Sequence, residues 1–132
     1  MKYIRIVYSE PIRDVGFRAG FLQAVYSLRE SKEVSDTLYV QLSELIEWFK
    51  ANLEIPEKFN RTSSKGAYRR NTSGLSWFKR DAREHVGKAF EARQLLLESG
   101  IETDVLRTDR VGYIVYEDAH QVVAEPFSET PT

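Results

Sequence analysis

Apolar and polar positions alternate near the end of the chain and predict three short strands. These strands cover residues 101–107, 111–116 and 121–125 and are separated by short turn sequences. Consecutive strands with such short connections are expected to pair antiparallel as a meander. Residues 2–8 are rich in β-branched and aromatic residues and predict a fourth strand. Because this strand is partly apolar on both faces, we expect it to join the same sheet rather than form an exposed edge.

Three other segments repeat their apolar residues every three or four positions, which is typical of helices buried on one face. The predicted helices cover residues 14–31, 36–53 and 77–99, and the regular part of the third begins near Asp81. Pro56 prevents the second helix from continuing. The order is therefore β-α-α-(basic loop)-α-β-β-β. It predicts an α+β fold in which helices cover one face of an antiparallel sheet that carries a C-terminal three-stranded meander.

A long polar loop, residues 57–76, separates the second and third predicted helices. Loops of this length inside compact domains are commonly functional or disordered. The loop is the one candidate domain boundary, but each flank is too short to make a convincing domain. We therefore expect one domain over residues 1–132, with a frayed tail over residues 127–132.

The order of elements resembles the architecture of small metal-independent ribonuclease toxins of the RelE-like type. The resemblance rests on element order alone, and it implies ribonuclease-like chemistry only as an expectation. Those toxins are usually shorter and strongly basic, whereas this chain has a net charge of −1 and an additional helix. No motif of the family is matched, so no catalytic residue is carried over and the chain is assigned to no family.

The composition is that of an ordinary folded domain, with 42% hydrophobic and 30% charged residues. The absence of cysteine excludes disulfides, thiolate zinc sites and a cysteine nucleophile. We find no secretory signal and no apolar run long enough for a membrane span. These observations predict a cytoplasmic protein, with no membrane partner and no cofactor.

Charge is distributed very unevenly along the chain. Residues 58–80, here called the basic segment, contain seven of the 19 basic residues and no acidic residue. The rest of the chain has 12 basic and 20 acidic residues, a balance of −8. Such asymmetry indicates an anionic partner, or a contact of the basic segment with acidic residues of its own chain or of a second subunit.

The basic segment also contains aromatic residues between its cations. Cations of this kind neutralise phosphates, and aromatic rings stack on bases. A helix beginning near Trp77 would add the partial positive charge of its N-terminus. The candidate ligand-binding residues are Arg61, Lys65, Tyr68, Arg69, Arg70, Trp77, Lys79 and Arg80.

The leading hypothesis is a small binding protein whose basic segment holds a phosphate-rich ligand, RNA or DNA above all, with nucleotides also possible. A second hypothesis is a metal-independent nuclease in which His85 or Tyr68 acts as acid or base. A third is an interaction or inhibitor protein, or a homodimer, that uses the basic segment as its contact surface. In that case the partner would be an acidic protein or the acidic body of a second copy, meaning the chain outside residues 58–80.

Other motifs add little chemistry. His85 lies near the apolar face of the third predicted helix, where a packed, hydrogen-bonded histidine is the simpler interpretation. His120 lies at a turn beside Glu117 and Asp118, where an acid–base or metal cluster competes with a merely polar turn. The spacing of the two histidines matches no zinc motif, so no metal site is expected, and neither a P-loop nor a G-x-S-x-G motif is present.

Overall fold

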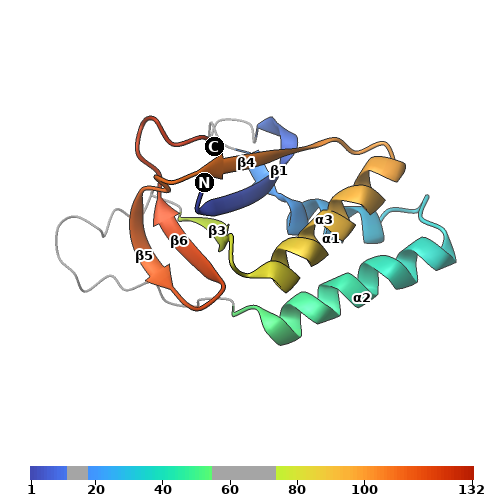
Figure 1. Ribbon diagram of the computed structural model, residues 1–132. Coiled ribbons are helices and arrows are strands. Elements are labelled where there is room, and N and C mark those ends of the chain that lie inside the picture. Colours follow the sequence, from blue (N-terminus) through green and yellow to red (C-terminus); the bar gives the residue numbers. More distant parts are fainter. Residues whose placement is uncertain (12–17, 55–73) are drawn as a thin grey trace.

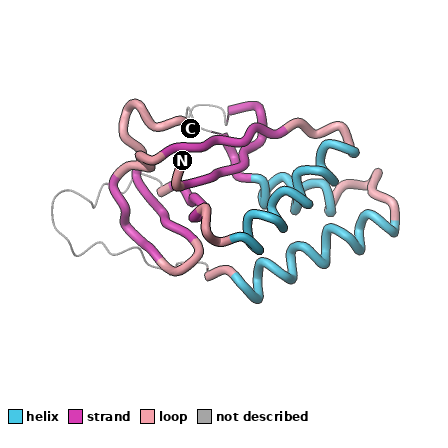
Figure 2. The backbone as a smooth tube through the Cα atoms, in the orientation of Figure 1, coloured by secondary structure: helices cyan, strands magenta, loops and turns pink. Residues whose placement is uncertain are grey.

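An antiparallel sheet with helices packed against it forms the part of the chain that the computed structural model describes, residues 1–11, 18–54 and 74–132 (Figure 1). The helices gather on one side of the strands (Figure 2). The predicted α+β class is thereby confirmed. In chain order the elements are β1 (Tyr3–Pro11), β2 (Arg18–Gly20), α1 (Phe21–Arg29), α2 (Asp36–Asn52), β3 (Leu75–Lys79), α3 (Arg83–Glu98), β4 (Thr103–Thr108), β5 (Tyr113–Glu117) and β6 (Gln121–Glu125).

Strand β1 organises the sheet, and all its pairings are antiparallel. Strand β4 lies along one edge of β1, from the pair Tyr3–Thr108 to the pair Tyr8–Thr103. The opposite edge is shared, because β3 pairs with the beginning of β1 and β2 pairs with its end. The sheet then continues from β3 through β6 to β5.

The C-terminal strands correct one detail of the prediction. β5 and β6 pair as a hairpin, but β4 pairs with β1 rather than with β5. The connection after β4 is more than a tight turn, because Val111 is buried within it and Gly112 adopts a φ of 118°. β1 is apolar on both faces and has strands on both edges. β2 and β3 pair with one edge, and β4 pairs with the other.

Two strands were absent from the prediction. Residues 18–20, expected within the first helix, form β2, and that helix begins at Phe21. Leu75–Lys79, expected partly in the loop and partly at the start of the third helix, form β3, and α3 begins only at Arg83. The neighbours Trp77 and Phe78 pack into different hydrophobic clusters, as the alternating geometry of a strand requires.

Other elements match the prediction closely. Helix α2 has the expected extent, and the Ser35 Oγ caps it by accepting a hydrogen bond from the Leu38 backbone N–H at 3.1 Å. Strand β6 covers the expected residues. Local sequence signals determine these elements, and for α2 they are the capping serine and the uninterrupted apolar stripe.

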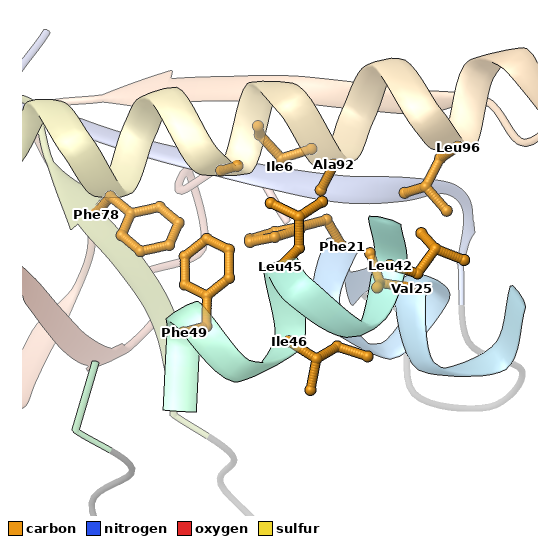
Figure 3. Packing of buried hydrophobic residues seen from close by; sticks show 11 residues of the cluster. Ile6, Phe21, Val25, Leu42, Leu45, Ile46, Phe49, Phe78, Ala92 and Leu96 are labelled. Carbon is orange, nitrogen blue, oxygen red and sulfur yellow. The ribbon is translucent and has the colours of Figure 1, made fainter. Parts of the chain in front are cut away.

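The main core lies between the sheet and the helices. Side chains from β1, β3 and all three described helices meet there (Figure 3). The rings of Phe21 and Phe49 meet edge to face with their centroids 5.5 Å apart, and Phe78 packs beside both. A second, smaller cluster contains Trp77 and Val111, together with Val122 and Ala124 of β6.

Candidate functional site

Most of the basic segment lies outside the described residues. Five of the eight candidate ligand-binding residues fall within residues 55–73, and the structure does not place them: Arg61, Lys65, Tyr68, Arg69 and Arg70. The described end of the segment is β3 with the residue that follows it. Trp77, Lys79 and Arg80 are therefore the candidates whose positions are known.

Trp77 belongs to the core rather than to the surface. Its side chain is 1% exposed and packs in the second hydrophobic cluster, opposite Val122 of β6. A ring enclosed in this way has no face open to a stacked base, so its predicted role as a stacking platform is not supported. The expected helix N-terminus near Trp77 is wrong as well, because α3 begins at Arg83.

Lys79 and Arg80 lie at the end of β3 and differ in their surroundings. The Lys79 Nζ lies 2.6 Å from the Glu117 Oε2, so this charge is paired across the sheet. The Arg80 side chain is 65% exposed, and its Nε lies 4.0 Å from the Asp81 Oδ1. Both residues line a shallow hollow of about 310 Å³ that Lys2 also borders. Arg80 therefore presents the most exposed positive charge of the described end of the basic segment.

The two histidines, far apart in the sequence, are stacked on each other. The rings of His85 on α3 and His120 on the β5–β6 turn have centroids 4.1 Å apart and an interplanar angle of 22°. His85 is 5% exposed, and its Nε2 donates a hydrogen bond to the Asn52 carbonyl oxygen at 2.7 Å. Trp48 packs against the same ring. With its Nε2 hydrogen-bonded and its ring covered, His85 has the environment of a structural residue.

Asp118 holds the β5–β6 turn in place. Its carboxylate accepts hydrogen bonds from the backbone N–H groups of His120 and Gln121, from the Gln121 side chain and from the Tyr116 hydroxyl. Partial burial opposes ionisation, but these hydrogen bonds outweigh it and hold the pKa of Asp118 below its ordinary value. The hydrogen bond to Asp118 in turn raises the pKa of Tyr116.

The acid–base or metal cluster considered for this turn is not formed. Glu117 pairs with Lys79, whereas Asp118 directs its oxygens toward its own turn. Among the residues that the structure describes, no group of three or more histidine, aspartate and glutamate side chains is arranged to hold a metal ion.

Arg5 is a residue that the sequence reasoning missed. It lies in the first half of β1 and is 8% exposed, although its side chain is a cation. Its guanidinium donates hydrogen bonds to two carbonyl oxygens, those of Ser76 at 3.2 Å and of Arg18 at 2.9 Å. The signal in the sequence is an arginine inside the apolar run of residues 3–8, where a buried strand position is unusual for a charge.

No family model, curated protein or solved structure matches this chain. Within the described ranges, none of the helices is long and apolar enough to cross a membrane.

Proposed function

We propose that this chain is a binding protein that holds a phosphate-rich ligand, RNA or DNA above all, through its basic segment. The observation that carries the proposal is the separation of charge along the sequence: seven basic and no acidic residues in the segment, against a balance of −8 elsewhere. Phosphate backbones are the common ligands of such concentrated positive charge, because binding releases their condensed counterions.

The outer surface of the helices supports a localised interface. Exposed carboxylates line α2 and α3, on the layer that covers one side of the sheet: Glu44, Glu47, Glu84, Glu91 and Glu98. Glu47 and Glu91 are paired with Lys50 and Lys88, whereas the other three carboxylates disfavour a nucleic acid on this layer. Arg80, exposed at the described end of the segment, contributes a phosphate contact in this proposal.

The test compares two charge reversals of equal size. Arg69→Glu/Arg70→Glu changes the basic segment, whereas Arg83→Glu/Arg107→Glu changes two exposed arginines outside it. Binding of fluorescently labelled single-stranded RNA and duplex DNA is measured by anisotropy at several salt concentrations. We expect the first variant to lose at least roughly tenfold in affinity, and its salt slope to fall by about 0.7 for each lost contact to a single strand. The control variant keeps most of its affinity.

Equal losses in the two variants would show that only net charge matters and would contradict the proposal. An unmodified chain that binds neither nucleic acid at low salt would also contradict it. In that case the basic segment is better explained as a protein contact surface. Light scattering at low and high salt then shows whether the partner is a second copy of the chain.

A further inference from the structure

The shared edge of β1 leaves a break in the sheet. On this edge β3 pairs with β1 at Tyr3 and Ile4, and β2 pairs with β1 at Val7 and Pro11. The backbone between Ile4 and Val7 therefore has no strand partner on this edge. A pocket of about 260 Å³ lies at the break. Arg5 lines this pocket, and its guanidinium joins the two sides by its hydrogen bonds to Ser76 and Arg18.

These two hydrogen bonds leave the charge of Arg5 uncompensated. Both acceptors are neutral carbonyl oxygens, and no ion pair joins Arg5 to a carboxylate within the described residues. The neighbouring Arg18 already pairs with Asp104 at 2.7 Å. Burial, followed by the charge of Arg18, lowers the pKa of Arg5 to about 10. A buried cation without a counter-charge is costly, and an anion in the pocket would offset that cost.

Hydrogen-bond donors around the break are also unused. The Arg5 Nε is buried and has no partner among the described residues, and the same is true of the indole N–H of Trp77, which lines the same pocket. A guanidinium has five N–H donors, of which the two carbonyls take two. The hydrogen bonds that join β2 to β3 therefore use only some of the N–H donors of Arg5.

The remaining walls of the pocket are mainly apolar. They come from α1, β3 and the residues that follow α2: Phe21, Leu22, Leu53 and Phe78. Apolar walls with a few placed polar groups are typical of sites for small organic molecules. Glu54, which is exposed, also lines the pocket, so the site contains one carboxylate that disfavours ligands with more than one negative charge.

We propose that this pocket binds a small organic anion, a molecule whose acidic group meets Arg5 while its apolar body lies against Phe21 and Leu53. The shared chemistry is a charge-assisted hydrogen bond from the guanidinium to a carboxylate or a phosphate monoester. The proposal does not depend on the function proposed above, because the pocket shares Trp77 with the candidate ligand-binding residues of the basic segment but none of the candidate cations of that segment.

The first experiment uses the wild-type residues of the pocket and compares three probes of similar shape. Benzoate and phenyl phosphate are anionic, whereas benzamide is neutral. Trp77 fluorescence is followed in the Trp48→Phe variant, which leaves Trp77 as the single tryptophan. We expect saturable binding of an anionic probe, at least roughly tenfold tighter than benzamide. Benzoate binding more tightly than phenyl phosphate identifies a carboxylate site, and the reverse order identifies a phosphate site.

Variants then assign the charge that recognises the anion. Arg5→Gln removes the positive charge, and we expect benzoate and benzamide to bind this variant alike. Arg18→Gln is the matched control, since it removes an adjacent arginine side chain but keeps the carbonyl that accepts from Arg5. Glu54→Gln is expected to tighten phenyl phosphate more than benzoate, because it removes a like charge from the pocket.

The proposal is overturned if the pocket does not prefer an anion to benzamide. It is also overturned if Arg18→Gln abolishes that preference while Arg5→Gln retains it. If Arg5→Gln fails to fold, the comparison of probes on the Trp48→Phe protein still shows whether the pocket prefers an anion to benzamide. The Trp48→Phe substitution leaves every residue of the pocket unchanged.

Discussion

Three glycine-to-alanine substitutions should have sharply different effects on stability, although each adds the same methyl group. Gly87 lies in the second turn of α3, where an added Cβ has nothing within 4 Å. Gly100 follows α3 with a φ of 83°, again with open space around the Cβ. Gly112 precedes β5 with a φ of 118°, and there the Cβ would overlap the backbone carbonyl of Glu125. The series separates helix propensity, backbone strain and steric overlap.

The expected magnitudes follow from these geometries. Gly87→Ala should stabilise the protein by about 0.5–1 kcal/mol, because alanine loses less backbone entropy in a helix. Gly100→Ala should destabilise it by about 1–2 kcal/mol, the cost of a left-handed conformation for an L-residue. Here the N–H groups of Gly100 and Ile101 donate to Leu97 and Leu96, a Schellman motif that requires the positive φ. Gly112→Ala adds overlap with backbone to the strain, and about 1–3 kcal/mol more is expected.

Equilibrium unfolding in urea, followed by far-ultraviolet circular dichroism, measures the three changes in free energy. Similar m-values across the series would show that the compactness of the folded and unfolded states is unchanged. The order of midpoints should be Gly87→Ala, unmodified chain, Gly100→Ala and Gly112→Ala, from highest to lowest. If Gly112→Ala unfolds at the midpoint of the unmodified chain, then the described approach of Gly112 to β6 is wrong, and so is the argument from strain.

Three further predictions concern the candidate site. Trp77→Ala should cost about 3–5 kcal/mol of stability, as for a core aromatic residue, and a loss below about 0.5 kcal/mol in urea unfolding would place the ring on the surface. Because the pKa of Asp118 is lowered in the folded chain, its carboxylate stabilises the fold above the ordinary aspartate pKa and loses this effect as the pH falls through the folded value. The urea midpoint of Asp118→Asn should therefore lie below that of the unmodified chain at about pH 7 and approach it at about pH 3, and a gap independent of pH would contradict the argument. His120→Ala should cost about 1 kcal/mol by removing the ring stacked on His85, and an unchanged unfolding midpoint would contradict the stacked arrangement.

The elements that the sequence predicted correctly are those decided by local signals. Helix α2 has its cap at Ser35 and an apolar stripe along its length, and β6 is a short apolar strand ended by Pro126. Strand β3 was missed because its signal is weaker than that of the helix beside it. Trp77 and Phe78 are adjacent and both apolar, and only the presence of a hydrophobic cluster on each face shows that they point in opposite directions.

Some features of the candidate site could likewise be predicted from the sequence, and others could not. The basic segment is a feature of composition, so it is visible without any structure. The roles of its described residues are not, because Trp77 packs in a cluster with Val111 and Val122 and Lys79 is paired with Glu117, and all three partners come from a later part of the chain. The stacking of His85 on His120 is likewise a contact between an early turn of α3 and a hairpin turn. No local spacing predicts a contact of this kind.

The sequence by itself determined the α+β class, the positions of the elements with strong periodicity and the separation of an acidic body from a basic segment. These properties depend on the order of residues over one or two turns of helix, or on simple counts of charge. Only the tertiary structure decided that β4 pairs with β1 and that β2 and β3 share the other edge. It also enclosed Arg5 at the break between them. The physical reason is that a strand can satisfy its backbone hydrogen bonds with any suitable edge, and the choice of edge depends on packing between residues far apart in the chain.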